Sequence, residues 1–358
     1  MEKAVVTAKG QIVIPSKLRR RFGIRKGTQV FIHEKDGEIV VKPITDEYIE
    51  SMAGVTDTKG KLLKAFNTPL AASKGPELTT KGYSIFDGTM ADMTYPEIEK
   101  AAREKAIVIF PAGVIEEHGP HLPLGVDTYE GYLKAKLLKM KLEKRGIRAL
   151  IAPPFYWGIN TATGAFPGSF NSREETVINV LWDAMASLKR WGLENVFFVN
   201  NHGDADHNLT MLTAIRKARL DTGTRAYYVI EDQLAKRLGL TGKEAYALVY
   251  RTAPPPPSKF IEVHAGGGET SVMWYYFPDL VKVDIWKTLK STDKTVQDLM
   301  IWRRGWEDAK RVTPQGFFGD PTAASPEKGQ KAFDEFTAAA AGVIEAQLKG
   351  QYQPVELK

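Results

Sequence analysis

The chain of 358 residues contains no cysteine. Disulfides and thiolate metal sites are therefore excluded, and any metal ion would have to be held by nitrogen and oxygen ligands. Long apolar runs are also missing. No segment approaches the roughly 18 uninterrupted apolar residues that span a bilayer, and the first residues lack the apolar core of a secretion signal. We therefore expect a cytoplasmic protein.

An excess of one sign of charge is absent from most of the chain. Residues 1–44 hold ten Lys and Arg against four Asp and Glu, whereas the remaining 314 residues hold 39 of each sign. The whole net charge of +6 therefore belongs to the front of the chain. The balanced body argues against a nucleic-acid surface there, while the basic front keeps one open.

Residues 1–46 predict a small β-rich unit. Short strands at 5–7 and 11–15 precede a brief helix over 17–22, and Asp36-Gly37 between two apolar runs is typical of a β-hairpin turn. So small a unit hardly buries a core of its own. We expect it to dimerise by exchanging strands between two chains.

The run TAKGQIVIP at residues 7–15, followed by Leu18-Arg19, Gly23-Ile24 and Gly27, resembles the AbrB/MazE/SpoVT family of swapped-hairpin DNA-binding domains. The resemblance implies a dimer that presents basic side chains to DNA phosphates. The counterparts here are Lys9, Lys17, Arg19, Arg20 and Arg21. The alternative is a unit that only dimerises the chain, with its charges forming a solvated surface.

Residues 47–85 are rich in small, polar and turn-forming residues, which predicts a linker. From residue 86 to 358 apolar strand-like runs alternate with amphipathic stretches, which predicts an α/β domain of three αβα layers with a mostly parallel sheet. The expected strands span 106–114, 148–153, 195–201 and 225–231, and the expected helices span 129–145, 174–191, 209–222 and 269–277.

Five of the six histidines fall in three short segments that also contain carboxylates or glycine. The segments read EEHGPH at 116–121, HGDADH at 202–207 and HAG at 264–266. Imidazole and carboxylate hold zinc, manganese or iron, so the pattern predicts a metal site assembled from distant parts of the chain. The first two segments directly follow expected strands, where parallel sheets bind their ligands.

The spacing within these segments predicts which side chains meet. Glu116 and His118 alternate across an extended turn and can aim at one point, and His202 and Asp204 repeat this spacing. With Asp127, which closes the first loop, they offer five donors. That number suits two divalent ions about 3.5 to 4 Å apart, which activate a bridging water for hydrolysis. We interpret the two remaining histidines of these segments, His121 and His207, as supporting or structural side chains.

Four successive segments resemble the motifs of the creatininase family of metal-dependent amidohydrolases. They read EEHGPHLPLGVD at 116–127, FPGS at 166–169, NNHG at 200–203 and HAGGGETS at 264–271. The family carries Glu-Gln-His-Gly-Pro-His-Leu-Pro, Phe-Pro-Gly-Thr, Asn-Gly-His-Gly and His-Ala-Gly with a later Glu-Thr-Ser. The similarity spans about residues 90 to 345. It implies a creatininase-like fold and a homo-oligomer, a hexamer in that family.

Carried over to this chain, the resemblance implies one or two divalent ions, zinc, manganese or iron. Glu116, Asp127 and His202 would hold one ion, and His118, Asp127 and Asp204 the second. Creatininase itself has glutamate at the position of Asp204, so the shorter carboxylate weakens that assignment.

The resemblance makes His264 the proton carrier of the reaction. Glu269, five residues later, would orient His264 or join the metal ligands, and we favour the first role; a favourable charge at a helix start is the third alternative. Glu117 replaces the family's glutamine and adds a negative charge, which either raises cation affinity or points outward.

These features predict a metal-dependent hydrolase of a carbon–nitrogen bond other than a peptide bond, namely a cyclic amide or formamide of a small nitrogenous metabolite. Creatinine is not the preferred substrate, because Lys259–Val263 replaces the tryptophan and aspartate that creatininase places before its histidine. The alternative function is a DNA-binding regulator whose body senses a metabolite.

Overall fold

The computed structural model describes residues 5–7, 12–26, 28, 30–35, 38–43, 83–254 and 258–357. The chain divides into two compact units, Met1–Lys81 and Gly82–Lys358. Three features expected from the sequence lie outside the described residues: Lys9, the turn at Asp36-Gly37, and residues 47–82 of the expected linker.

The front unit contains the expected short helix and hairpin. Helix α1 spans Ser16–Arg21, and strands β1 (Val30–Lys35) and β2 (Glu38–Pro43) pair antiparallel with Lys35 opposite Glu38. Gly23, with φ of 65°, follows the helix in the left-handed conformation that glycine adopts at no steric cost. Apolar residues here stay largely exposed, among them Val5, Val6, Ile12, Val13 and Ile39. Such exposure is what a unit with little core of its own would show, and strand exchange remains a prediction.

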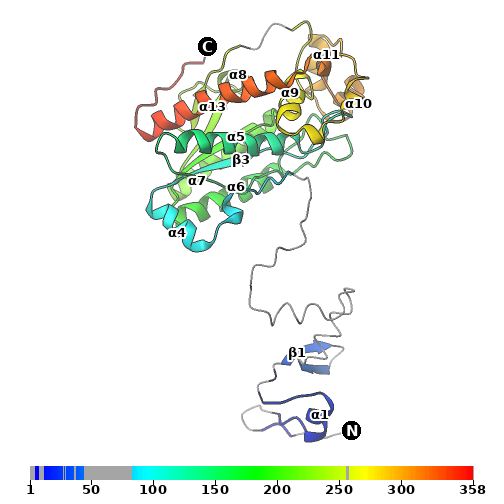
Figure 1. The fold of residues 1–358 in the computed structure, drawn as a ribbon, viewed down its shortest axis with the longest axis vertical. Coiled ribbons are helices and arrows are strands. Elements are labelled where there is room, and N and C mark those ends of the chain that lie inside the picture. Colours follow the sequence, from blue (N-terminus) through cyan, green and yellow to red (C-terminus); the bar gives the residue numbers. More distant parts are fainter. Residues whose placement is uncertain are drawn as a thin grey trace. The chain divides into compact units, whose positions relative to one another are not determined.

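The body alternates strands and helices as the sequence pattern predicts (Figure 1). Its strands are β3 (Ile107–Ala112), β4 (Ala149–Ile151), β5 (Asn195–Asn200), β6 (Arg225–Glu231) and β7 (Ala247–Tyr250). Its α-helices are α4 (Tyr95–Arg103), α5 (Val126–Glu143), α6 (Glu174–Arg190), α7 (Ala205–Thr222), α8 (Asp232–Arg237), α9 (Gly267–Tyr276), α10 (Val283–Trp286), α11 (Val296–Trp302), α12 (Trp306–Val312) and α13 (Pro326–Leu348). Short 3₁₀ turns are η1 (Met90–Asp92), η2 (Pro278–Leu280) and η3 (Pro321–Ala323).

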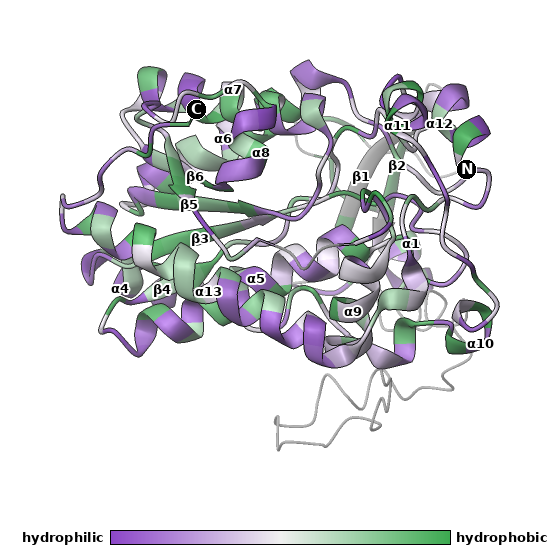
Figure 2. Cartoon of the chain, turned by 90° about the horizontal axis from the view of Figure 1, so that it is seen from above, coloured by the Kyte–Doolittle hydropathy of each residue, from purple (hydrophilic) through white to green (hydrophobic). Residues whose placement is uncertain are grey.

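The five body strands form one sheet in the order β4-β3-β5-β6-β7, and every neighbouring pair is parallel. The strands of this sheet are mainly apolar, with polar residues at the ends of β5 and β6, whereas the helices carry both hydrophilic and hydrophobic residues (Figure 2). This difference follows from burial on both faces, since each strand is covered by helices on either side.

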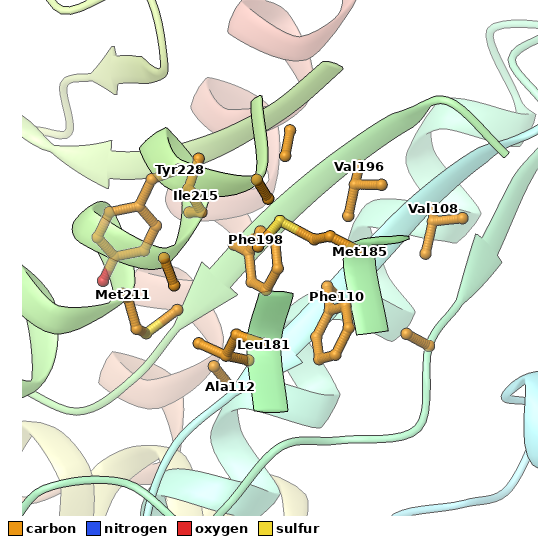
Figure 3. Close-up of a cluster of buried hydrophobic side chains, with 14 of the residues drawn as sticks. Val108, Phe110, Ala112, Leu181, Met185, Val196, Phe198, Met211, Ile215 and Tyr228 are labelled. Atoms are coloured by element: carbon orange, nitrogen blue, oxygen red, sulfur yellow. The ribbon is translucent and has the colours of Figure 1, made fainter. Parts of the chain in front are cut away.

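Alternate strand residues belong to two separate cores. Val108 and Phe110 of β3 pack with α6 and α7, together with Phe198 of β5 (Figure 3). Ile107 and Ile109 of the same strand pack toward α5, α9 and α13. The period of two along a strand therefore produces the αβα layers that the sequence predicts.

The connections change direction next to β3. The chain passes from β3 through α5 to β4, and then returns through α6 to β5 on the other side of β3. The helices that follow β3 and β5, namely α5 and α7, cover opposite faces of the sheet, so the loops after these two strands lead in opposite directions. Open α/β sheets bind their ligands at the carboxyl ends of strands at such a point. No helix of the described residues is long and apolar enough to cross a membrane.

Candidate metal centre

The loop after β3 supplies a buried glutamate and a buried histidine. Glu116 is 2% exposed, its backbone N–H donates to Leu124 O at 3.0 Å, and its Oε2 accepts a hydrogen bond from Thr163 Oγ1. His118 is fully buried, and its Nδ1 lies 3.2 Å from Glu116 O. A proton on Nδ1 fits that carbonyl and leaves Nε2 with a free electron pair.

Asp127 stands in the first turn of α5, which two glycines press against the end of β3. A Cβ on Gly131 would lie 2.5 Å from Ala112 O, and a Cβ on Gly113 would lie 2.6 Å from Asp127 O. Only glycine permits such close backbone approach. The first turn of α5, and with it Asp127, is thereby held at the carboxyl end of the sheet.

His202 follows β5 and joins these residues from the neighbouring strand. Its Nε2 lies 3.0 Å from Ile159 O and carries a proton, so Nδ1 is the nitrogen that could bind an ion after losing its own proton. Nδ1 lies 2.9 Å from Glu116 Oε1 and 3.0 Å from Asp127 Oδ2. Its backbone is fixed as well, because Asn200 Nδ2 and Asn208 Nδ2 both donate to His202 O, at 2.7 and 2.9 Å.

The segment before α9 brings a third histidine and a second glutamate. The main chain of His264 forms an isolated antiparallel β-bridge with Phe318, and the centre of its ring lies 4.5 Å from the centre of the His118 ring. Its Nδ1 is 4.0 Å from Glu116 Oε1. Glu269, in the first turn of α9, accepts the backbone N–H of Ala265 at 2.5 Å.

Three sets of side chains place one potential ligand atom each within 4.8 Å of one another. They are Glu116 with His118 and His264, Glu116 with Asp127 and His202, and His118 with Asp127 and Glu269. Two atoms of these sets, His118 Nε2 and Asp127 Oδ2, are buried and form no hydrogen bond of good geometry with the described residues, although His202 Nδ1 lies 3.0 Å from Asp127 Oδ2. Buried polar atoms of this kind require a partner, and two lone-pair donors fit a divalent cation. The residues present therefore fit a metal ion.

The charges in the cluster attract cations. Although burial alone lowers the pKa of His202, Glu116 and Asp127 raise it well above its ordinary value. Burial raises the pKa of Asp127, but His118 and His202 outweigh it and hold that pKa well below its usual range. For His264 burial is likewise outweighed, by Glu116 and then Glu117, which raise its pKa to about 10. Protons on these imidazoles compensate the carboxylates, and a divalent ion would displace them.

Asp204, expected as a ligand, lies elsewhere. It caps the start of α7, where Oδ1 accepts the N–H of His207 at 3.1 Å and Oδ2 that of Thr161 at 2.9 Å. Both oxygens are thus used by backbone donors, and within the described residues Asp204 belongs to none of the three sets. Glu269, for which orienting His264 was the favoured role, stands instead with His118 and Asp127.

The two other histidines support the fold around the site. His121 Nε2 lies 2.9 Å from Thr270 Oγ1, and burial, with the nearby His118 and His264, lowers its pKa to about 4. His207 accepts the N–H of Ile159 through Nδ1 at 3.3 Å. Neither belongs to the three sets found in the described parts of the chain.

Glu117 points inward, to His264. Its Oε1 is 3.4 Å from His264 Nε2, and its carbonyl oxygen lies 2.7 Å from the same nitrogen. Its Oε2 accepts the N–H of Gly119 at 2.9 Å. A Cβ on Gly316 would lie only 1.8 Å from that oxygen, so glycine leaves the space the carboxylate occupies.

Sequence patterns missed three polar neighbours of the site: Glu130, Thr163 and Asn201. Glu130 is 3% exposed and accepts a hydrogen bond from Asn201 Nδ2 at 2.8 Å. The expected helix began only at residue 129, so the spacing of three residues between Asp127 and Glu130, which places both on one face of α5, was not recognised. Thr163 offered none, because its loop meets Glu116 only in the folded chain.

Four of the five basic residues expected to contact DNA are described by the structure, and they lie on one short helix. Lys17, Arg19, Arg20 and Arg21 belong to α1 and are exposed. Arg19 Nε donates to Ile14 O at 3.1 Å. The helix has no acidic residue in its first turn and three arginines in its last, so its surface is strongly positive.

Comparison with known proteins gives matches for both units. A family model described as creatinine amidohydrolase (creatininase) matches residues 91–344. The MazE model, for antitoxins that take part in antidote-toxin recognition, matches residues 3–48.

Curated relatives are similar over most of the body. The mycofactocin precursor peptide peptidase of Mycobacterium ulcerans is 27% identical over 233 residues, 64% of this chain and 80% of that protein. The creatinine amidohydrolase of Pseudomonas putida is 24% identical over 254 residues, 69% of this chain and 91% of that protein.

Solved structures share the fold. The structure described as "Creatininase Mn" superimposes with a TM-score of 0.53 at 20% identity, covering 75% of this chain and 99% of that one. A mutant creatininase of "Zn-Zn type" gives 0.53 at 21%, covering 76% and 100%. Both resemblances inferred from motifs are thereby confirmed, as is the three-layer α/β fold. The chain belongs to the creatininase family and carries a MazE-like domain at its amino terminus.

Proposed function

We propose that the body is a metal-dependent hydrolase of an amide carbon–nitrogen bond. The observation that carries this proposal is the geometry of His118 and His202. Each is bonded through one ring nitrogen to a backbone carbonyl, and each turns its other nitrogen toward Asp127, at 3.7 and 3.0 Å. Metal-binding histidines are typically oriented in this way.

Two ligand groups follow from the three sets. Glu116, Asp127 and His202 would hold one divalent ion, and His118, Asp127 and Glu269 the second, with Glu269 taking the place expected for Asp204. The solved relatives described with manganese and with zinc support these metals, and iron accepts the same ligands. Ions held there supply a Lewis acid and lower the pKa of water.

His264 is proposed as the proton carrier. Its Nε2 lies against Glu117, so its Nδ1 is the atom that faces the ligands, 4.0 Å from Glu116 Oε1. A proton held at Nδ1 can pass to the leaving nitrogen as the amide bond breaks. Trp302, whose ring centre is 6.1 Å from that of His264, would shield this atom from solvent.

The preferred substrate class is a non-peptide amide, cyclic or a formamide, as in a creatinine amidohydrolase. A peptide is the second candidate, because the relative from Mycobacterium ulcerans is named as the peptidase of a precursor peptide. In both cases the scissile bond is an amide, and the proposed chemistry is the same.

Purified protein tests this proposal directly. We expect bound zinc, manganese or iron by elemental analysis, and hydrolysis of lactam, formamide or peptide substrates that stops on chelation and returns with added ion. His202→Ala should abolish it, whereas His33→Ala, in the front unit, should not. Activity that survives both chelation and His202→Ala would refute a metal-dependent reaction.

We propose that the chain consists of a front unit at residues 1–46, a linker at 47–85 and the hydrolase body at 86–358. For the front unit we propose DNA binding through phosphate contacts. The match to a MazE antitoxin and the exposed basic residues of α1 support it, with Lys9 as a further contact expected from the motif. The body would then be an enzyme carried by a DNA-binding dimer. A pure regulator is the less favoured alternative, because the ligand side chains are complete.

Gel-shift experiments with the chain's own upstream DNA at two salt concentrations test this second proposal. Binding should weaken steeply with salt and with Arg19→Ala, Arg20→Ala and Arg21→Ala together. Absence of binding at low salt would leave dimerisation as the role of the unit. In that case, removal of residues 1–46 should reduce the number of chains in the assembly, measured from its mass in solution.

A further inference from the structure

Glu130 is a buried carboxyl outside the three candidate ligand sets. It stands three residues after Asp127 on α5, so the two side chains share one face of the helix. Its Oε2 accepts the Asn201 hydrogen bond at 2.8 Å, while its Oε1 has no partner among the described residues. Burying a carboxyl costs free energy unless hydrogen bonds compensate it. The hydrogen bond from Asn201 and the positive charge of Lys134, four residues later on α5, compensate part of this cost.

Asn201 joins Glu130 to Asp127. The same Nδ2 that donates to Glu130 also lies 3.5 Å from Asp127 Oδ1. Asp127 Oδ1 faces His118 Nε2 at 3.7 Å, and Asp127 Oδ2 faces His202 Nδ1 at 3.0 Å. Asp127 can serve two ligand sets only if the plane of its carboxylate is fixed. Asn201 contacts Oδ1, the oxygen directed to His118, and so limits rotation of that plane.

Asn201 directly follows β5 and precedes His202. A side chain here ties the end of β5 to α5, and Lys134 makes a second tie by donating to Asn200 O at 3.3 Å. These bonds fix the element that carries His202 against the one that carries Asp127.

We propose that Asn201 and Glu130 are a pair of positioning residues that hold Asp127 with its two oxygens directed to two different ion positions. This inference rests on the proposed metal centre. It adds that two side chains outside the ligand sets fix the geometry of the shared aspartate.

The test is the affinity of the full-length protein for Zn²⁺, measured by competition with a chelating indicator, with stoichiometry from elemental analysis. Asn201→Gly and Glu130→Ala should each weaken binding about 10- to 100-fold, the usual effect of removing an outer partner of a ligand. The double variant should lose no more than either single one, because the two act as one unit. Glu130→Gln keeps an acceptor for Asn201 and should bind nearly as wild type.

Thr252→Val is the matched control. It removes a 2.6 Å hydrogen bond to Glu231, a carboxylate at the end of the neighbouring strand β6, and should leave Zn²⁺ binding unchanged. Asn201→Gly changes one side chain in the loop after β5, so the fold should persist, which circular dichroism would verify.

The positioning role would be refuted if Asn201→Gly and Glu130→Ala bound Zn²⁺ with wild-type affinity, or if their losses added in the double variant. Neither result would contradict the metal centre. A wild-type protein that binds no Zn²⁺, Mn²⁺ or Fe²⁺ would overturn the metal centre, and this role with it.

Discussion

Replacing Asp127 with asparagine removes one charge at the residue shared by two of the three ligand sets, with almost no change in side-chain volume. Oδ2 lies 3.0 Å from His202 Nδ1, and Oδ1 lies 3.7 Å from His118 Nε2. An amide has one oxygen to offer and turns an NH₂ group toward the other position. The affinity of both ion positions should therefore fall together.

The magnitude follows from linkage between binding and folding. An ion that binds only the folded protein at about 100 times its Kd stabilises it by about 2.7 kcal/mol. For a domain of this size each kcal/mol raises the unfolding midpoint by about 2 °C, so the wild type should gain about 5 °C. If the variant binds about 100-fold more weakly, the gain falls to about 0.4 kcal/mol, less than about 1 °C.

Differential scanning calorimetry with chelator and with Zn²⁺ or Mn²⁺ measures these shifts. Asp87→Asn is the control, because Asp87 pairs with Lys136 at 2.6 Å on the surface and should leave the gain of the wild type intact. Equal shifts in Asp127→Asn and wild type would refute the shared-ligand role. No shift in the wild type would refute the metal centre itself.

Three further predictions concern the surroundings of the site. Glu117→Gln removes a negative charge that, together with Glu116, raises the pKa of His264. That pKa should fall in the variant, and the alkaline limb of kcat against pH should move to lower pH. The surface variant Glu99→Gln should leave the limb in place, and an unmoved limb in Glu117→Gln would contradict the contact. Gly131→Ala should destabilise the fold by about 1 to 3 kcal/mol in urea, despite the helix preference for alanine, because its Cβ meets Ala112 O at 2.5 Å. Gly342→Ala, on α13 with open space around its Cβ position, should instead stabilise by about 0.5 to 1 kcal/mol, and equal signs would count against this reasoning. Tyr228→Phe removes the hydroxyl that accepts a hydrogen bond from Asn200 at 3.1 Å and donates one to Asn208. The free energy of unfolding, measured by chemical denaturation, should fall by about 1 kcal/mol. Tyr95→Phe, at an exposed side chain, should cause no loss.

Local pattern was enough to predict the central part of the body, but β7 and the helices α4, α8 and α10 to α13 were not expected. Apolar runs of strand length alternating with amphipathic stretches predicted β3, β5, β6 and the helices α5, α6 and α7 within a few residues. The starts of α5 and α7 were placed too late, at 129 and 209 instead of 126 and 205. Their first turns are polar because they face the site, so apolar periodicity could not reveal them.

The front unit and the linker show a different limit. A turn signal predicted the hairpin, and the helix expected over 17–22 is found as α1, because both depend on neighbours in sequence; Ser16, expected as the cap, is instead the first residue of the helix, after Pro15. Dimerisation and DNA contact depend on a second molecule, and they remain predictions.

The sequence by itself determined that the site is built from nitrogen and oxygen donors, and that Glu116, His118, Asp127 and His202 follow strand ends of a parallel sheet. Only the tertiary structure decided which carboxylate stands with His118 and Asp127. Asp204 had the right spacing from His202, but the backbone N–H groups of Thr161 and His207 occupy its oxygens. Glu269 lies with His118 and Asp127 because the segment before α9 forms a β-bridge between His264 and Phe318, which brings it back to the site. His264 and Phe318 are far apart in sequence, so this contact could not be predicted from local spacing.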